Sequence, residues 1–375
     1  MSTLRITRPN ELTIEIAGGS RFPIHPLWLR ERCRDSKTID LRTEQRLEDP
    51  SDWDLQLGLT CVAEVEPGRY RIRFTDGHEA DFLAREILAE ADLLPGDHDC
   101  PPVRLWDGSL TDIPRLAWVS NPTEAVEASW LKPFLELGFV IFTGVPTETK
   151  QVLKVGSTFG HVRDTNFGMH FDVRSLPDAN DLAYTSLFLD PHTDNPYRSP
   201  VPGVQLLHCL ANETSGGLST LVDGFAAAET LRSQDPDAFR VLSRTPVRFR
   251  FRDVDTELVR SSSLIEVDGV GGLQAINFSP RLDYVPLLPP AELTVYFGAR
   301  KKLDALLRSP KYEIRFLLNA GDLMMMDNRR LLHGRTAFDT REGLRHLQGC
   351  YIDVDGPRSA YRVLRRKLSA SGSQS

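Results

Sequence analysis

Residues 312–338, YEIRFLLNAGDLMMMDNRRLLHGRTAF, have the pattern of two apolar strands joined by a turn. The segment FVIFTGV, residues 139–145, is a second apolar run, typical of a strand buried on both faces. Helical spacing lies between these two blocks of strands, most clearly over residues 291–309. Strands on either side of helices imply pairing between distant segments. The sequence therefore predicts an α+β chain whose larger domain is a β-sandwich or jelly roll.

The residues before this large domain have a different pattern. Residues 62–82, VAEVEPGRYRIRFTDGHEADF, alternate apolar and polar side chains and are interrupted by the turn signals EPG and TDG. The segment that follows them is rich in proline and has no sustained periodicity. We predict a small β-rich N-terminal domain (1–95), a linker (96–120), the large domain (121–368) and a disordered tail (369–375).

The composition is that of a globular protein with a small-molecule partner. Hydrophobic residues make up 41% and charged residues 26% of the 375 residues, which is unlike a disordered chain. The net charge of −7 excludes the basic field that binding to nucleic acid or a membrane surface needs. No segment approaches the roughly 18 apolar residues of a membrane span, and the N-terminus lacks the apolar run of a signal peptide. We expect a cytoplasmic protein that forms a homodimer.

The segment LDPHTDNPYR, residues 189–198, places an imidazole and a carboxylate two residues apart. In a strand, His192 and Asp194 would share one face. A mononuclear iron(II) site needs two imidazoles and one carboxylate on one side of the metal, and His333 can supply the second imidazole. The alternative is that both histidines are ordinary polar residues at loop ends.

A single HxD pair is weak evidence for a metal site, because His170 and Asp172 form a second one. Basic residues downstream of His333 add an independent signal. Arg341 and Arg345 both follow it, and a guanidinium one strand later can bind the distal carboxylate of 2-oxoglutarate through two hydrogen bonds. We select Arg345, since Arg341 lies in the polar turn DTREG.

Six segments carry a resemblance to a known family. They are, in order along the chain, HTDNPYR, PGVQLLHC, GGLSTLVDGF, INFS, GDLMMMDNRRLLHGR and RHLQGCYIDVD. The series closely resembles the γ-butyrobetaine and trimethyllysine hydroxylase family of iron(II)/2-oxoglutarate dioxygenases, and the similarity extends to HPLWLRERC and DGH in the N-terminal domain. The resemblance implies a double-stranded β-helix, which is a cupin-like jelly roll, with flanking helices.

The resemblance also implies cofactors and the residues that bind them. His192, Asp194 and His333 correspond to the iron ligands, and Arg345 corresponds to the anchor of the 2-oxoglutarate carboxylate. Thr220 corresponds to a hydroxyl on the same carboxylate, although a β-branched residue is also ordinary in a strand. The expected cofactors are Fe(II), 2-oxoglutarate and O2, with ascorbate as a stimulant.

The family hydroxylates substrates with a trimethylammonium group, which an aromatic cage holds by cation–π attraction. The positions that correspond to the cage are Phe167, Phe171, Tyr184 and Tyr351. Without the resemblance, aromatic residues near strand ends would be assigned to the core. Because Phe171 separates His170 from Asp172, these two point away from the cage, and we expect a structural role for that HxD pair.

Four further side chains are candidates for the acid end of the substrate: Asn195, Arg198, Asn277 and Arg281. Two guanidinium groups are more than one carboxylate can use, whereas a phosphonate offers three oxygens and nearly two negative charges. This favours 2-(trimethylammonio)ethylphosphonate, hydroxylated on the carbon next to phosphorus, as the substrate. γ-Butyrobetaine or another betaine is the alternative substrate, and surface ion pairs are the alternative role of Arg198 and Arg281.

Two classes outside this family use similar residues. A zinc hydrolase binds its metal through two histidines and a carboxylate, and a cupin-like binding module keeps the fold without catalysis. The hydrolase gives no role to Arg345 or to the aromatic residues.

Many family members hold a structural zinc ion in the N-terminal domain through three cysteines and a histidine. Here only Cys33 and His78 remain, while Asp35 and Thr38 replace the other two thiols. A structural zinc ion needs four ligands, so we expect no zinc in this domain. The five cysteines are scattered and never form a CxxC pair, which predicts reduced thiols.

Overall fold

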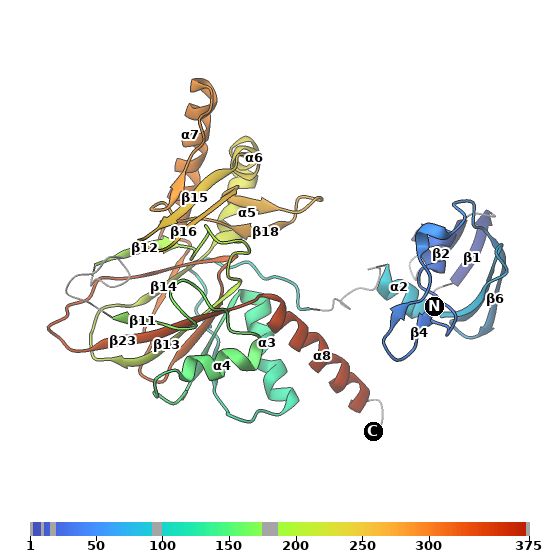
Figure 1. The fold of residues 1–375 in the computed structure, drawn as a ribbon, viewed down its shortest axis with the longest axis horizontal. Coiled ribbons are helices and arrows are strands. Elements are labelled where there is room, and N and C mark those ends of the chain that lie inside the picture. The colour runs from blue at the N-terminus through green and yellow to red at the C-terminus, as the bar shows by residue number, and fades with distance from the viewer. Residues whose placement is uncertain (1–2, 9–10, 16–19, 92–99, 175–186, 373–375) are drawn as a thin grey trace. The chain divides into compact units, whose positions relative to one another are not determined.

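The computed structural model describes residues 3–8, 11–15, 20–91, 100–174 and 187–372 (Figure 1). The chain divides into two compact units, Met1–Asp99 and Cys100–Ser375. Each unit has its own hydrophobic core.

The first unit contains two three-stranded antiparallel sheets. The first sheet consists of β1 (Thr3–Arg8), β2 (Glu11–Glu15) and β3 (Arg21–Ile24), and the second of β6 (Leu59–Glu66), β7 (Arg69–Phe74) and β8 (Glu79–Leu83). The other elements are α1 (Pro26–Arg30), β4 (Ile39–Asp40), β5 (Gln45–Arg46), the 3-10 turn η1 (Pro50–Asp52) and α2 (Ala84–Glu90). Alternation in β7 builds the core, because Tyr70, Ile72 and Phe74 are buried while the arginines between them face solvent.

The second unit contains two larger sheets. The six-stranded sheet has the order β11 (Phe171–Arg174), β23 (Arg345–Ile352), β13 (Val204–Asn212), β21 (Leu323–Asp327), β10 (Phe139–Thr143) and β9 (Arg115–Ala117). The four-stranded sheet has the order β12 (Leu189–His192), β22 (Leu331–Arg335), β14 (Ser219–Asp223) and β20 (Glu313–Phe316). Neighbouring strands are antiparallel except for β9 and β10. The two sheets are consistent with the predicted double-stranded β-helix.

Strand β10 explains why the sequence has continuous apolar runs. Its Val140 and Phe142 pack into a cluster beneath the helices, whereas Phe139 and Ile141 pack into a cluster between the two sheets. The neighbouring strand β21 distributes its methionines in the same way. A strand in the middle layer is buried on both faces, so apolar side chains occupy every position.

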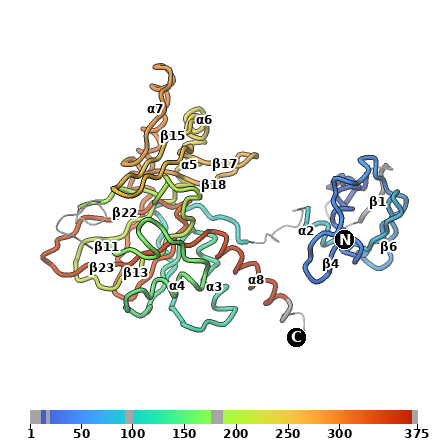
Figure 2. Tube along the Cα trace, in the orientation of Figure 1, coloured from blue at the N-terminus to red at the C-terminus, as the bar shows by residue number. Residues whose placement is uncertain are grey.

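Helices lie on both sides of the two sheets. Helices α3 (Glu124–Leu137), α4 (Gln151–Phe159) and α8 (Asp355–Gly372) cover the outer face of the six-stranded sheet (Figures 1 and 2). Helices α5 (Gly224–Gln234), α6 (Pro236–Arg244) and α7 (Pro290–Leu307) pack together beside β15 (Val247–Arg252), β16 (Glu257–Ser262), β17 (Ile265–Val267), β18 (Leu273–Ile276) and β19 (Asp283–Tyr284). The Thr123 hydroxyl caps α3 by accepting a hydrogen bond from the backbone N–H of Val126 at 3.3 Å.

Two predicted boundaries differ from the structure. Residues 100–120 were assigned to a linker, but they belong to the second unit, where the buried Trp106 indole donates a hydrogen bond to the carbonyl of Leu137 at 2.7 Å. Helix α8 continues to Gly372, into the predicted disordered tail, and residues 373–375 lie outside the described part of the chain.

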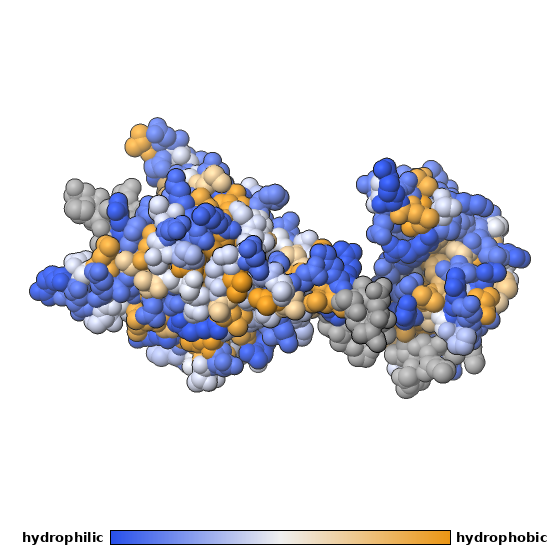
Figure 3. All heavy atoms as spheres, turned by 90° about the horizontal axis from the view of Figure 1, so that it is seen from below, coloured by the Kyte–Doolittle hydropathy of each residue, from blue (hydrophilic) through white to orange (hydrophobic). Residues whose placement is uncertain are grey.

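No helix within the described residues has both the length and the apolar character needed to cross a membrane. Figure 3 shows hydrophilic and hydrophobic residues interspersed on the visible face of each unit.

One buried histidine of β13 makes the second unit sensitive to acid. His208 is fully buried in the six-stranded sheet. Burial disfavours its charged form and lowers its pKa from 6.5 to about 4, although the nearby backbone of Val145 opposes the shift. The unfolded chain therefore binds a proton at His208 below pH 6.5, while the folded chain remains neutral there until about pH 4.

Between pH 7 and pH 5, we expect the free energy of unfolding of the native chain to fall by about 2 kcal/mol more than that of a His208→Leu variant. Denaturant titrations at the two pH values measure this difference. His161→Leu, which changes an exposed histidine, is the control. An equal pH dependence of the native chain and the His208→Leu variant would contradict the assignment.

Candidate active site

The strand pair β12 and β22 brings the predicted metal ligands together. His192 is paired with His333 in the antiparallel register, and the centroids of their rings are 4.4 Å apart. Asp194 follows β12, with Oδ1 3.4 Å from His192 Nε2 and Oδ2 3.8 Å from His333 Nε2. One ligand atom from each of the three side chains lies within 4.8 Å of the others. Two imidazoles and a carboxylate thus converge as a mononuclear iron site requires.

Neighbouring polar groups hold the carboxylate of this cluster. The Tyr351 hydroxyl and the Gln205 amide both donate to Asp194 Oδ2, at 2.7 and 2.6 Å. The Asp190 carbonyl lies 2.8 Å from His192 Nδ1, which leaves Nε2 to face Asp194. Hydrogen bonds of this kind orient metal ligands. Sequence reasoning missed Gln205, although a glutamine inside the buried strand GVQLLHC was a signal that could have found it.

The charges in the cluster suit a divalent cation. Burial alone would raise the pKa of the Asp194 carboxyl, but the attraction of His333 and the hydrogen bonds with His192 and Tyr351 outweigh it and hold the pKa well below its usual range. Burial lowers the pKa of His333 to about 4, and the positive charges of His192 and Arg281 lower it further. The negative charge of Asp194 acts in the opposite direction. At neutral pH the carboxylate is ionised and the His333 imidazole is neutral, which are the forms that bind metals.

A small cavity of about 90 Å³ borders the cluster. It is lined by His192, Asp194 and His333 together with Phe171, Val173, Leu189, Gln205, Leu207, Ser219, Gly334, Arg335, Arg345 and Leu347. Burial lowers the pKa of Arg345, and burial together with the nearby Arg345 lowers the pKa of Arg335 to about 10. Arg345 donates to the Gly217 carbonyl at 3.3 Å, and its Nε has no hydrogen-bond partner among the described residues. Two buried guanidiniums suit an anion such as a carboxylate.

The choice between the two downstream arginines agrees with this geometry. Arg341 is largely exposed and forms an ion pair with Asp339 two residues earlier, whereas Arg345 is buried in the cavity wall. Thr220 is buried and its hydroxyl has no hydrogen-bond partner among the described residues. However, it is the preceding Ser219 that lines the small cavity.

A larger cavity of about 600 Å³ also borders the cluster. Its aromatic walls are formed by Phe167, Phe171, Tyr197, Phe251, Tyr284 and Tyr351. The rings form pairs, with centroid distances of 5.3 Å between Phe171 and Tyr351 and 5.1 Å between Tyr197 and Phe251. Three of the four predicted cage positions, Phe167, Phe171 and Tyr351, line this cavity, while Tyr184 lies outside the described residues. Their role as a cage stays a prediction. Sequence reasoning missed Tyr197 and Phe251. Phe251 lies in the segment VRFRFRD, where alternation indicates a strand but not the neighbours of that strand.

The polar walls of this larger cavity include only part of the predicted acid-binding set. Asn195 and Arg281 line the cavity, and Arg250 and Arg252 of β15 join them. The side-chain oxygen Oδ1 of Asn195 accepts a hydrogen bond from the Tyr197 hydroxyl at 2.6 Å. The side-chain nitrogen Nδ2 of Asn195 has no hydrogen-bond partner among the described residues.

Arg198 and Asn277 are not among the lining residues of the larger cavity, contrary to their predicted role. The guanidinium of Arg198 donates to the side-chain carbonyl of Asn166. The buried Asn277 amide donates to the Ser263 carbonyl at 3.0 Å and to Glu266 at 2.8 Å. Both side chains are engaged within the protein, and the sequence alone could not identify these partners.

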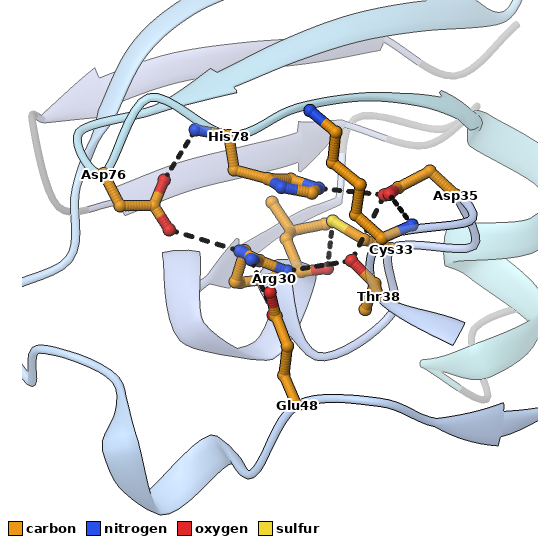
Figure 4. A network of polar contacts seen from close by, with 9 residues as sticks. Arg30, Cys33, Asp35, Thr38, Glu48, Asp76 and His78 are labelled. Carbon is orange, nitrogen blue, oxygen red and sulfur yellow. Dashed lines mark hydrogen bonds and ion pairs between the residues drawn. The ribbon is translucent and has the colours of Figure 1, made fainter. Parts of the chain in front are cut away.

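The N-terminal unit contains a second polar cluster (Figure 4). Ligand atoms of Cys33, Asp35 and His78 lie within 4.8 Å of one another, so three groups that can hold a metal meet where two were expected. Internal hydrogen bonds already connect them, since His78 Nε2 is 2.8 Å from Asp35 and the Thr38 hydroxyl donates to Asp35 at 3.2 Å. Burial raises the pKa of the Cys33 thiol to about 12 in spite of the adjacent Arg30. The expected absence of zinc stays a prediction.

Comparison with known proteins agrees with the site. Residues 115–351 match the taurine catabolism dioxygenase TauD, TfdA family. The chain is 34% identical to the gamma-butyrobetaine dioxygenase of Pseudomonas sp. (strain AK-1), over 95% of this chain and 94% of that protein. It is 36% identical to the human gamma-butyrobetaine dioxygenase, over 91% of each chain, and 25% identical to the trimethyllysine dioxygenase of Meyerozyma guilliermondii, over 92% and 91%.

Among solved structures, an asparagine oxygenase in complex with Fe(II), 3-hydroxyasparagine and succinate has the same fold. The TM-score is 0.50 at 16% identity, over 61% of this chain and 78% of the other. The protein is a dioxygenase, which sets aside the zinc hydrolase and the binding module. Its cofactors are iron, 2-oxoglutarate and O2, and the His-Asp-His cluster and the cationic cavity fit the first two. The chain belongs to the TauD/TfdA family of dioxygenases.

Proposed function

We propose that this dioxygenase hydroxylates a small acid that carries a trimethylammonium group. The observation that carries the proposal is that two different cavities meet at one metal-binding cluster. His192 and Asp194 line both the small cationic cavity and the large aromatic one. One cavity suits the cosubstrate and the other the substrate, and both give access to the same metal.

Each cavity has a separate task in this proposal. His192, Asp194 and His333 hold the iron, while Arg345 binds the distal carboxylate of 2-oxoglutarate with a hydroxyl from Ser219 or Thr220 beside it. Iron, 2-oxoglutarate and O2 together supply the oxidant that hydroxylates a C–H bond. The protein determines which C–H bond faces the iron by fixing both ends of the substrate.

The aromatic walls of the large cavity bind the cation. A trimethylammonium group has no hydrogen to donate, so ring faces are its natural partners. Phe171 and Tyr351 are adjacent to the metal cluster, since Tyr351 also hydrogen-bonds Asp194. Phe167 and Phe251 extend this aromatic surface.

For the acid end we propose a phosphonate, and specifically 2-(trimethylammonio)ethylphosphonate hydroxylated on the carbon next to phosphorus. Arg281 lines the cavity and lies close enough to His333 for its charge to affect that imidazole. An acid group bound there would hold its neighbouring carbon beside the metal. The unpartnered amide of Asn195 adds a neutral donor.

A γ-butyrobetaine substrate is the second candidate. Two gamma-butyrobetaine dioxygenases are 34% and 36% identical to this chain over more than nine tenths of its length. With Arg198 and Asn277 engaged elsewhere, Arg281 and Asn195 are also a sufficient set of donors for a single carboxylate.

Replacing Arg281 should separate these two substrates. We expect Arg281→Met to lower kcat/KM for the phosphonate about tenfold more than for γ-butyrobetaine, because the second negative charge of the phosphonate loses the Arg281 guanidinium as its partner. Product formation with each compound, at saturating 2-oxoglutarate, measures the ratio. Arg198→Met is the control, since its guanidinium binds Asn166 instead of lining the cavity. Equal losses for both compounds would contradict the phosphonate proposal.

The role of Arg345 can be tested through the cosubstrate. Arg345→Met should raise the KM for 2-oxoglutarate by about one to two orders of magnitude, which is the effect of losing hydrogen bonds between charged groups. The KM for the main substrate should change far less. Arg341→Met serves as the control because this arginine is exposed. Similar increases in both KM values would argue against an anchoring role.

The Tyr351 hydroxyl is expected to support the metal. Tyr351→Phe keeps the ring but removes the hydrogen bond to Asp194, so metal affinity should fall about 10- to 100-fold. Titration of the metal-free protein with Mn²⁺ or Co²⁺ measures this without turnover. Tyr312→Phe, which removes a buried hydroxyl bonded to Thr230, is the matched control. Unchanged affinity in Tyr351→Phe would remove the hydroxyl from the metal site.

A further inference from the structure

The cavity-lining ring of Phe171 rests directly on the backbone of a glycine. Strands β11 and β23 are neighbours (Figure 2). Phe171 of β11 is paired with Gly349 of β23. A Cβ atom on Gly349 would lie 2.3 Å from Cζ and 2.5 Å from Cε2 of the Phe171 ring. The φ of Gly349 is outside the left-handed region, so the backbone itself would accept alanine. Glycine is required at this position because the ring occupies the space of a side chain.

The position of this ring affects both cavities. Phe171 lines the small cationic cavity and the large aromatic cavity. Its ring stacks against Tyr351 with an interplanar angle of 30° and a centroid distance of 5.3 Å. Any displacement of the ring away from Gly349 therefore moves one wall of the substrate site.

Polar contacts fix the strand that carries this ring. Among the residues that the structure describes, strand β11 is at the edge of its sheet and pairs with β23 alone. Asp172, the residue after Phe171, points to the opposite face, where His346 Nε2 lies 2.6 Å from its carboxylate and the Gln348 amide donates to it at 3.0 Å. These contacts select one register, since a slip of one residue would turn Phe171 out of the cavity. They give Asp172, one member of the second HxD pair, a structural role.

We propose that Gly349 is a specificity-determining position, which seats the Phe171 ring and so sets the width of the aromatic wall that faces the cation. The identity of the cation rests on the proposed function above. Gly349 touches neither substrate nor metal in this account and acts through Phe171. A side chain at position 349 moves the ring into the cavity and narrows the space for three methyl groups.

The test compares two glycine-to-alanine variants. In Gly349→Ala, a crystal structure should show the Phe171 ring displaced from β23. The KM for the trimethylammonium substrate should rise about tenfold, and the affinity for Mn²⁺ should be unchanged. Gly298→Ala in α7, where a Cβ would meet no atom within 4 Å, is the control. It should leave the ring position, the KM and the Mn²⁺ affinity unchanged. An undisplaced ring or an unchanged KM would overturn the proposal.

A second background excludes a general folding defect. In a Phe171→Leu chain the smaller side chain leaves room for a methyl group, so adding Gly349→Ala should change neither the KM nor the midpoint of thermal unfolding further. Equal losses in both backgrounds would overturn the proposal. If the native enzyme hydroxylates no trimethylammonium compound, the proposed function fails. The ring position in Gly349→Ala, and the unfolding midpoints of the native chain, the two single variants and the double variant, still decide whether Gly349 seats Phe171.

Discussion

The antiparallel pairing of β12 with β22 is the interaction on which the site depends. It places His192 opposite His333, and the chain then continues for two residues to Asp194. Side chains alternate between faces along a strand, so a shift of one residue in this pairing would turn one imidazole away from the other. The pairing in turn relies on β14, which binds the other edge of β22 and places Leu221 in the core between the two sheets.

A second constraint is electrostatic, because the site concentrates buried positive charge. Arg335 and Arg345 both line the small cavity, and burial lowers the pKa of each. A buried cation is unfavourable unless an anion or a set of hydrogen bonds compensates it. Asp194 is the one acidic residue among the described side chains that line this cavity, and its carboxylate is already held by Tyr351 and Gln205. A bound dicarboxylate would supply the missing negative charge, so cosubstrate binding should stabilise the folded protein as well as complete the active site.

The parts of the site that the sequence predicted are those whose position follows from local strand geometry. His192 ends β12 and Asp194 lies two residues beyond it, His333 is in the middle of β22, and Arg345 begins the strand that follows a polar turn. Gln205 and Phe251 were missed because they enter the site through the packing of distant strands, which no local pattern reveals. Among the helices, α3 was predictable because Thr123 caps it and Gly138 ends it in the left-handed region.

The acid-binding residues show how partners decide a role that residue type leaves open. Arg198 and Arg281 have the same chemistry, and each is close to a family motif, since Arg198 ends HTDNPYR and Arg281 follows INFS by two residues. However, Arg198 is turned toward Asn166 and Arg281 lines the cavity. Arg250 also lines it, but its guanidinium is 2.7 Å from Glu257, so part of its charge is already neutralised. Arg281 is exposed, so solvent screens its attraction for an anion. In the proposed function, discrimination between one and two negative charges therefore depends on how closely the acid group approaches Arg281 and Asn195, and an aromatic wall that binds the other end of the substrate would control that approach.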